Sequence, residues 1–425
     1  MVVGSESLVE ANNLHKERRT FWFAASLIMG LGLALGAFLV MGASGGEVLA
    51  GRNSPSADGV PVQVSASHAW LLETVDTGSG YLSLALEPIS PYTPHIAYYV
   101  YLGDHQSMLR HAWWTAAGWL SETVDSIDQT GQYASLALEP TVPYTAHVAY
   151  YTGYPTYNLK HAWRSSNGWL SETVEAAGTV GLHTALAIEP APPHRPHISY
   201  YDGSTQDLKH AWRSSTGWLS ETVDAYGDVG WYTSLALEPT SPFTPHISYY
   251  FVGAGDLKYA WRSAGGWLSE TVDSVAQAGL YTSLALEPVA PYTPHISYQV
   301  KMANAHLKHA WLGGGTWHTE VVDNTGSDVG EYTSLALEPI TPFVPHISYR
   351  HSDGNGLKHA WWTPSGWLSE TAVSDGSPGW YSSLALEPDE PYVPHIAFYD
   401  DTNYTVRHAW MASDLCYLPL VRVDD

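Results

Sequence analysis

Glutamate and histidine recur eight residues apart along the chain, and they are the first candidates for chemistry. The pairs are Glu87/His95, Glu139/His147, Glu189/His197, Glu238/His246, Glu287/His295, Glu338/His346 and Glu387/His395. Because carboxylates and imidazoles bind metals and transfer protons, one interpretation is a ring of metal or acid–base sites. A catalytic centre is asymmetric and occurs once, whereas seven copies favour structure. We therefore expect each pair to hydrogen bond where a hairpin opens.

A second repeated pair joins histidine to glutamate across another hairpin. If Arg213 pairs with Trp218 around a turn, His210 lies opposite Glu221. The same arithmetic pairs His161 with Glu172, His309 with Glu320 and His359 with Glu370, and it places Tyr259 opposite Glu270. A tyrosine can still donate a hydrogen bond there, which suits a structural role better than metal ligation. Cross-strand pairs of this kind contribute about 0.2–1 kcal/mol each.

These residues belong to a repeat of 49 or 50 residues. Its most visible mark is the phrase Trp-Leu-x-Glu-Thr, which begins at Trp70, Trp119, Trp169, Trp218, Trp267, Trp317 (in looser form) and Trp367. Three further phrases follow in order, namely Ser-Leu-Ala-Leu-Glu-Pro, Pro-His-Ile-Ser-Tyr and Leu-Lys-His-Ala-Trp. All four are rich in β-branched or aromatic residues and are separated by Gly, Pro, Asp and Ser, so each predicts a strand. Four strands in each of seven copies give 28 strands.

The repeat predicts an all-β fold, a seven-bladed β-propeller of four-stranded antiparallel blades over residues 67–411. A single sheet of this size cannot bury both faces, so the copies must pack on one another and close into a ring. The Ser-Leu-Ala-Leu strand carries small residues, which suits the innermost position. The repeats begin with the strand 67–75 and end with the strand 406–410. We expect the first strand to complete the last blade and so remove the open edges.

The ordered phrases resemble the tandem repeats of bacterial extracytoplasmic seven-bladed β-propeller proteins. The resemblance covers roughly residues 67–411 and rests on all four phrases. The pattern is more distantly similar to sialidase-type propellers and propeller lectins. This resemblance implies a binding role at the cell surface or after secretion.

Two of the four loops in each repeat keep their length and two vary. In an up-and-down blade the constant loops share one face of the disc and the variable loops share the other. Functional residues concentrate on variable loops of a rigid scaffold, so the variable face is where we expect a ligand. The candidate ligand-binding residues are Asp202, Asp228, Trp231, Asp328, Glu331, His351, Asp353 and Trp380. Acids mixed with aromatics suit carbohydrate, and the alternative interpretation is solvated loop acids with incidental aromatics.

The N-terminal part predicts a membrane anchor. Residues 21–43 are uncharged and mostly apolar, and they are long enough to span a hydrocarbon core as one transmembrane helix. Basic residues precede this segment, which places residues 1–20 in the cytoplasm and the propeller outside. Residues 44–66 resemble a flexible linker. The alternative is a secretory signal cleaved near residues 48–50, with the protein then secreted.

Composition excludes several classes of function. The 425 residues contain 18 Lys and Arg against 42 Asp and Glu, a net charge of −24, which opposes binding to nucleic acid. The single cysteine, Cys416, lies in a tail at 412–425 and cannot form an intramolecular disulfide. Sialidases need an arginine cluster, but most propeller arginines occupy repeat positions, which leaves mainly Arg195 and Arg350.

The sequence favours a monomeric, non-catalytic propeller that recognises a glycan or a surface protein. The alternatives are a sialidase-like or glycosidase-like hydrolase and a structural component of a surface layer. We assign no catalytic residue, metal ligand or cofactor.

Overall fold

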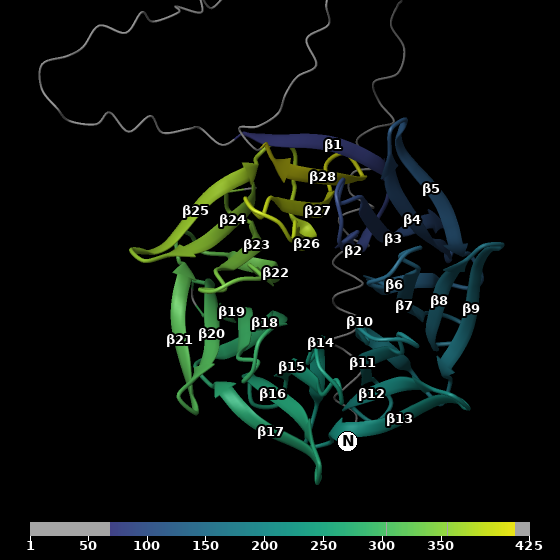
Figure 1. The fold of residues 1–425 in the computed structure, drawn as a ribbon, viewed down its shortest axis with the longest axis horizontal. Helices are drawn as coiled ribbons and strands as arrows, with labels where there is room; N and C mark the ends of the chain where they lie inside the picture. The colour runs from purple at the N-terminus through teal and green to yellow at the C-terminus, as the bar shows by residue number, and fades with distance from the viewer. Residues whose placement is uncertain (1–68, 303, 355, 413–425) are drawn as a thin grey trace, which may run out of the picture. The chain divides into compact units, whose positions relative to one another are not determined.

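The computed structural model describes residues 69–302, 304–354 and 356–412, which form seven four-stranded antiparallel sheets around one axis (Figure 1). The seven-bladed propeller predicted from the repeat is confirmed. Within these ranges no helix is long and apolar enough to cross a membrane. The predicted segments 1–20, 21–43 and 44–66 and the tail with Cys416 lie outside the described residues.

Each blade presents its strands from the axis outward in a fixed order. The innermost strands are β2 (Gly80–Leu86), β6 (Thr130–Leu138), β10 (Val180–Ile188), β14 (Val229–Leu237), β18 (Gln277–Leu286), β22 (Val329–Leu337) and β26 (Trp380–Leu386). The second strands are β3 (Pro94–Gly103), β7 (Ala146–Thr152), β11 (Pro196–Asp202), β15 (Pro245–Phe251), β19 (Pro294–Lys301), β23 (Pro345–His351) and β27 (Pro394–Asp400). The third strands are β4 (Gln106–Thr115), β8 (Leu159–Ser165), β12 (Asp207–Ser214), β16 (Asp256–Ser263), β20 (His306–Gly313), β24 (Gly356–Thr363) and β28 (Thr405–Met411). The outermost strands are β5 (Gly118–Asp125), β9 (Gly168–Glu175), β13 (Gly217–Asp224), β17 (Gly266–Asp273), β21 (Thr316–Asp323), β25 (Gly366–Val373) and β1 (Trp70–Thr77).

The first strand of the repeat region closes the ring. Strand β1 pairs antiparallel with β28, with Leu71 opposite Trp410 and Trp70 opposite Met411. The innermost strands contact one another around the whole axis, including β26 with β2. The first six blades therefore consist of consecutive strands, and the seventh joins the two ends of the repeat region, as the sequence predicted.

The hydrophobic core lies between neighbouring blades. The second strand of each blade has other strands on both sides and blades against both faces, so β11 is buried along its whole length. At each blade boundary, apolar residues of two adjacent blades form one cluster; Ala149 of the second blade, for example, packs with Ile198 of the third. This is the burial that a lone sheet could not achieve.

Polar contacts also join the blades. Tyr150 of the second blade is fully buried, and its hydroxyl donates to Asp125 of the first at 2.7 Å. The ammonium group of Lys160 contacts the same carboxylate, which satisfies an otherwise buried charge. Equivalent tyrosine–carboxylate contacts join the other blades through Tyr98/Asp76, Tyr200/Glu175, Tyr249/Asp224, Tyr298/Asp273 and Tyr349/Asp323.

The boundary between the sixth and seventh blades replaces this polar contact with an apolar one. Phe398 stands where the other blades have tyrosine, and Val373 stands where they have the carboxylate. Arg407, at the lysine position, contacts Asp400 at 3.2 Å instead. Both partners have thus lost their polar groups together, so no buried hydroxyl or carboxylate is left unpaired.

Candidate functional site

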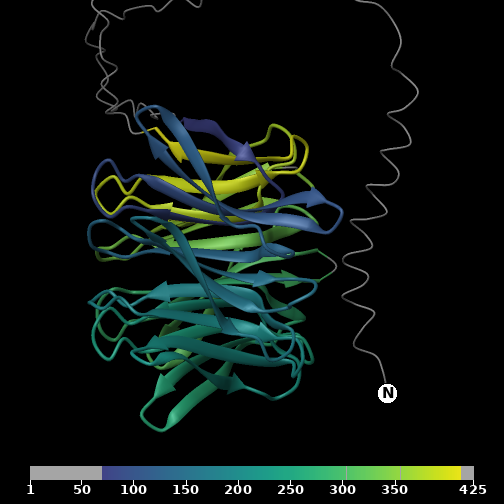
Figure 2. The ribbon, with the colours of Figure 1, turned by 90° about the vertical axis from the view of Figure 1, so that its right-hand side faces the viewer.

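The loops of variable length lie at one end of the blades. Because the four strands alternate in direction, the loops that join second to third strands share an end with the loops that join one blade to the next. The loops around Glu87 and around Ser165 lie at the other end, which we call the constant face. Figure 2 shows the blades from the side, with loops at both ends of the strands.

An unbroken ring of aromatic side chains surrounds the axis. One residue near the start of each innermost strand contributes to it: Tyr81, Tyr133, His183, Tyr232, Tyr281, Tyr332 and Tyr381. Adjacent ring centroids are 4.6 to 4.9 Å apart, and Tyr381 returns to Tyr81. We call this set the axial ring. The ring and the residue after each of its members line a cavity of about 240 Å³.

The axial ring depends on a backbone conformation that bulky residues rarely adopt. All seven members have φ between 45° and 55°, in the left-handed region. At each site the strand pairing skips residues, as between Gly80 and Ser83. Such a bulge redirects a side chain, here toward the axis. Non-glycine residues in this region cost about 1–3 kcal/mol each, so surrounding packing must hold them there.

His183 is the one imidazole in a ring of phenols. Burial lowers the pKa of His183 to about 3, so its ring is neutral at physiological pH. Burial also raises the pKa values of Tyr133, Tyr281 and Tyr332 well above 10. The axial ring is therefore uncharged, with phenol and imidazole groups available for neutral hydrogen bonds.

An aromatic cluster with one carboxylate lies beside the axial ring between the third and fourth blades. The Trp231 indole nitrogen and the Tyr201 hydroxyl both donate to Asp228 Oδ1 at 2.9 Å. The Trp231 ring lies 5.3 Å from His183 and 5.8 Å from Tyr201. The structure thus brings together two predicted site residues, Asp228 and Trp231. We call Tyr201, Asp228 and Trp231 the Trp231 cluster.

A second cluster lies across the axis, between the sixth and seventh blades. The guanidinium of Arg350 lies 4.1 Å from the Trp380 ring centre and donates to Glu331 Oε2 at 2.5 Å. Ser352 also donates to this carboxylate, at 2.6 Å. Trp380 lies 5.6 Å from Tyr332 of the axial ring. Arg350 therefore links the predicted residues Glu331 and Trp380. We call Glu331, Arg350, Ser352 and Trp380 the Trp380 cluster.

Asp328 lies near the Trp380 cluster in a different electrostatic environment. Burial, followed by the nearby Glu331 charge, raises the pKa of Asp328. The Gln299 amide donates to it at 3.3 Å. Glu331, in contrast, has a direct ion pair with Arg350. The two carboxyl groups therefore differ in their neighbours, a neutral amide for Asp328 and a guanidinium for Glu331.

Two other predicted site residues, Asp202 and Asp353, accept hydrogen bonds from loop backbone. Asp202 is buried and accepts the backbone N–H of Ser204 at 2.9 Å. Asp353 accepts the backbone N–H of Ser327 at 2.6 Å. His351 is half-buried in the register opposite Val329. The assignment of these three residues to a ligand stays a prediction.

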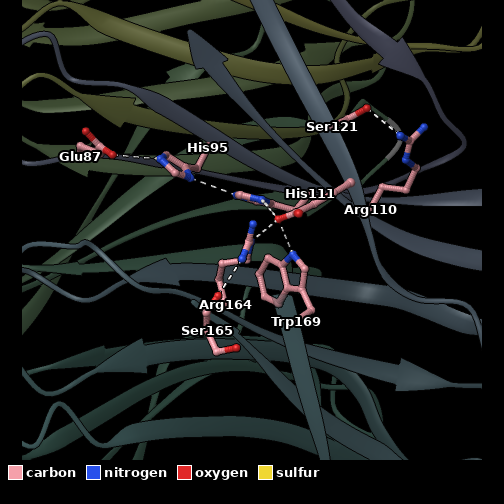
Figure 3. A network of polar contacts seen from close by, with 9 residues as sticks. Glu87, His95, Arg110, His111, Ser121, Arg164, Ser165 and Trp169 are labelled. Carbon is pink, nitrogen blue, oxygen red and sulfur yellow. Dashed lines mark hydrogen bonds and ion pairs between the residues drawn. The ribbon is translucent and has the colours of Figure 1, made fainter. Parts of the chain in front are cut away.

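On the constant face, the repeated Glu–His pairs form longer networks than the sequence predicted (Figure 3). His95 Nε2 lies 3.3 Å from Glu87, as predicted, while its Nδ1 lies 3.0 Å from His111 Nε2. His111 Nδ1 lies 3.8 Å from Glu122. The remaining six Glu–His pairs have contacts of 3.1 to 3.3 Å. In the first, second, third, fifth and sixth blades, a contact between the two imidazoles joins both Glu–His pairs into one chain of side chains, which we call the relay.

The relay reaches into the next blade. Glu122 accepts the indole N–H of Trp169 at 2.7 Å and the Nε–H of Arg164 at 2.5 Å, both from the second blade. The pKa of Glu122 is lowered to about 2, and its neighbours His111, Arg164 and Trp169 contribute in that order. Four of the repeated tryptophans, Trp70, Trp119, Trp169 and Trp317, donate in this way to a neighbouring blade.

The positions of the protons in the relay explain why a tyrosine, Tyr259, can stand where other blades have a histidine. Burial lowers the pKa of His95 to about 3 and that of His111 as well, so both rings are neutral. His95 then donates from Nε2 to Glu87 and must accept at Nδ1 from its partner. In the fourth blade the Tyr259 hydroxyl contacts His246 Nδ1 and supplies that one donor. The register opposite Glu270 is as predicted, but the tyrosine contacts the histidine.

Sequence reasoning missed Tyr201, Arg350 and the axial ring as site elements. The sequence could have indicated Arg350 as a site residue, because it is one of few arginines outside the repeat positions. The sequence could also have indicated the axial ring, since an aromatic residue precedes the small residues of every innermost strand. The small residues do form the innermost strands, but large side chains, and not small ones alone, occupy the axis.

Comparisons with known proteins place the chain by its fold. No protein-family model matches the sequence, and no curated protein matches it. An ulvan lyase of polysaccharide lyase family PL25, bound to -[GlcA(1-4)Rha3S]-, is 12% identical with a TM-score of 0.53, over 79% of this chain and 94% of that one. The Aleuria aurantia lectin with alpha-methyl-L-fucoside is 12% identical with a TM-score of 0.46, over 71% and 98%. An α-L-arabinofuranosidase of Fusarium graminearum with arabinobiose is 12% identical with a TM-score of 0.46, over 66% and 92%.

At this identity the likenesses show the propeller fold and no more. The neighbours include lectins as well as enzymes, so they do not decide between binding and catalysis. The narrower resemblance to bacterial extracytoplasmic repeat proteins stays a prediction.

Proposed function

We propose that the protein is a non-catalytic carbohydrate-recognition module whose glycan binds on the variable-loop face beside the axial ring. One observation carries this proposal: two tryptophan–carboxylate clusters adjoin the same uncharged aromatic ring from opposite sides of the axis. Indole faces stack against the apolar faces of sugars, while carboxylates and a guanidinium exchange hydrogen bonds with hydroxyl groups. Few convergent polar groups among aromatic walls are typical of a ligand site.

The charge of the chain narrows the ligand class. With a net charge of −24 the protein repels polyanions at low ionic strength. Within the Trp380 cluster, Glu331 already neutralises Arg350. A neutral glycan therefore suits the face better than a sulfated or phosphorylated one. A protein partner that presents no sugar is the competing ligand.

Binding of the full chain to a glycan array tests the proposal. We expect binding to one class of neutral glycan, and a loss of roughly ten-fold or more in affinity for Trp231→Ala or Trp380→Ala, because each removes an aromatic stacking surface. The matched control is Tyr226→Ala, which removes an exposed aromatic from a variable loop outside both clusters. Equal affinity of all three variants would contradict the assignment of the site.

A hydrolase is the second candidate, and Asp328 is the observation that favours it. Glycosidases pair a carboxyl group that stays protonated with one that stays ionised; burial raises the pKa of Asp328, and Glu331 lies nearby in an ion pair with Arg350. Turnover of chromogenic glycosides that is lost in Asp328→Asn would favour this candidate. Binding without turnover favours the recognition module.

We also propose that residues 21–43 anchor the chain in a membrane, with the propeller outside the cytoplasm as a monomer. The apolar length of this segment and the basic residues before it support the proposal. Retention of the full chain in carbonate-washed membranes, with the propeller accessible to external protease, is the expected result. Release of a shortened, soluble chain would favour a cleaved signal.

A further inference from the structure

A second cavity, away from the axial ring, lies between the first and second blades on the constant face. Its volume is about 440 Å³, within the range of small-molecule sites. The first blade contributes Trp113 and Glu122 to its lining, and the second blade contributes Tyr144, Arg164 and Ser166. We call it the inter-blade pocket. Figure 3 shows Arg164 beside the relay of Glu87, His95 and His111 that borders the pocket.

The pocket combines an aromatic wall with a fixed polar pair. The Trp113 indole stacks on His111, with ring centres 5.4 Å apart and planes 16° apart. Arg164 donates from Nε to Glu122 and from Nη1 to the Ser165 carbonyl oxygen at 2.7 Å. These two contacts use two of the five guanidinium N–H groups, and the side chain is 37% exposed. The relay and the backbone thus hold the guanidinium in place while it can still donate to a ligand.

The charges of the pocket define the chemistry it accepts. Two carboxylates, Glu87 and Glu122, line it together with one guanidinium, while the histidines between them are neutral. The balance is one net negative charge, which disfavours anions. A neutral molecule that both accepts from Arg164 and donates to Glu122, and that has an apolar face for Trp113, fits this arrangement.

The arginine–glutamate pair occurs at three blade boundaries, although the rest of the relay is repeated more widely. Arg213 lies 3.3 Å from Glu172, and Arg262 lies 3.3 Å from Glu221. At the other four boundaries the arginine position holds Leu312, Trp362, Met411 or Trp114. The fold therefore does not require arginine here, since four blades pack without it. A residue that the scaffold can do without, held by a structural relay, is available for recognition.

We propose that the inter-blade pocket binds a neutral polyhydroxylated ligand the size of a monosaccharide, with Arg164 and Glu122 bonding its hydroxyl groups and Trp113 covering its apolar face. Arg213 and Arg262 occupy the equivalent positions at the next two blade boundaries, so one chain presents up to three such sites. These sites are independent of the axial ring and lie on the opposite face. One chain would then bind a glycan-coated surface through several weak sites at once, which raises the overall avidity.

The test uses saturation-transfer difference NMR on the full chain with D-glucose, D-galactose, D-mannose and L-fucose as probes. We expect signals from at least one sugar. The triple variant Arg164→Leu/Arg213→Leu/Arg262→Leu copies the residue that the fifth blade carries at Leu312, so the packing of the blades is matched. It should weaken that binding roughly ten- to hundred-fold, because it removes charged hydrogen-bond donors.

Two further variants separate this proposal from the recognition site on the other face. Trp231→Ala/Trp380→Ala removes the axial-face site, and the sugar signals that remain in this background should be lost when the three arginines are also replaced. Trp362→Arg places an arginine opposite Glu320 and should add one site per chain in a calorimetric titration. Failure of every sugar to bind in the Trp231→Ala/Trp380→Ala background, or binding in that background that survives the triple arginine substitution, would overturn the inference.

Discussion

The indole N–H of Trp119 in the first blade donates to Glu73 Oε2 at 3.0 Å, and Glu73 lies on β1, the strand that closes the ring. Trp70 of β1 makes the equivalent contact to Glu370 of the sixth blade, also at 3.0 Å. The strand from the start of the repeat region is therefore held by its pairing with β28 and by indole–carboxylate bonds on both sides.

Trp119→Phe should lower the free energy of unfolding by about 1 kcal/mol. The change keeps an aromatic ring in place but removes the donor to Glu73, whose partial exposure limits the loss. Urea denaturation followed by intrinsic fluorescence measures the effect. Tyr154→Phe, at an exposed loop position, is the control and should leave the unfolding midpoint unchanged. An unchanged midpoint in Trp119→Phe would mean that the bond does not stabilise the ring.

Phe398→Tyr should destabilise the protein by about 1–3 kcal/mol. The new hydroxyl would be buried opposite Val373, which offers no acceptor side chain. Adding Val373→Asp should recover most of this loss, because the pair would then copy Tyr150 with Asp125, with Arg407 as the cation. A double-mutant cycle in urea measures the coupling between the two positions. Additive effects would show that the paired loss of polar groups has no energetic basis.

Ala185→Ser should stabilise the protein by about 0.5–1 kcal/mol. In the other blades a serine at this position accepts a backbone N–H from the next blade, as Ser135 does from Leu186 at 3.0 Å. Ala185 offers no such acceptor to Leu235. The matched reverse change, Ser135→Ala, should destabilise by a similar amount. Thermal unfolding of both variants checks the prediction, and a shift in the same direction for both would contradict it.

The fold should lose stability as the pH falls below about 6.5. The pKa values of His95, His147, His197 and His295 are about 3 in the folded chain because of burial, whereas unfolded histidine has a pKa near 6.5. The unfolded chain therefore binds more protons between these values, and protonation favours unfolding. The stability is fully present above pH 6.5 and declines toward pH 3.

His111→Tyr tests whether the buried histidines cause the loss of stability at low pH, with a residue that the chain already has at the equivalent position of another blade. The variant copies Tyr259 of the fourth blade, which donates to the neighbouring histidine without a second titrating imidazole. We expect the urea midpoint to fall less steeply between pH 7 and pH 4.5 than it does in the unchanged protein, because one fewer proton is taken up on unfolding. Parallel pH profiles for both proteins would assign the acid sensitivity to other groups.

Much of the fold could be predicted because the sequence repeats it. Four phrases in fixed order fixed the number of strands, and the position of the first Trp phrase predicted the pairing of β1 with β28. The turn arithmetic that placed His210 opposite Glu221 was also confirmed. Each of these follows from local periodicity, which is copied seven times and therefore visible.

The axial ring could not be derived by the same reasoning. A regular strand alternates its side chains, but Tyr81 lies in a bulge at φ 45°, and the tertiary closeness of seven strands is what holds it there. The relay was missed for a related reason: His95 and His111 are not directly opposite in the register, so pairing arithmetic finds each glutamate contact but not the contact between the imidazoles.

The candidate site was only partly predictable. Asp228 with Trp231, and Glu331 with Trp380, come together because each pair lies close to the start of innermost strands that face one axis. Asp202 caps its own turn and Asp353 accepts a backbone N–H from the loop before β22, and loop length alone cannot distinguish such roles from ligand binding. Arg350 joined the site only through the register of β22 with β23.

The most direct test of carbohydrate recognition on the variable-loop face is a crystal structure of the protein soaked with its best ligand from the glycan array. The account predicts a sugar ring stacked on the Trp231 or Trp380 indole, with hydroxyl groups bonded to Asp228, Glu331 or Arg350. A glycan that binds in solution but occupies neither cluster in the crystal would contradict it.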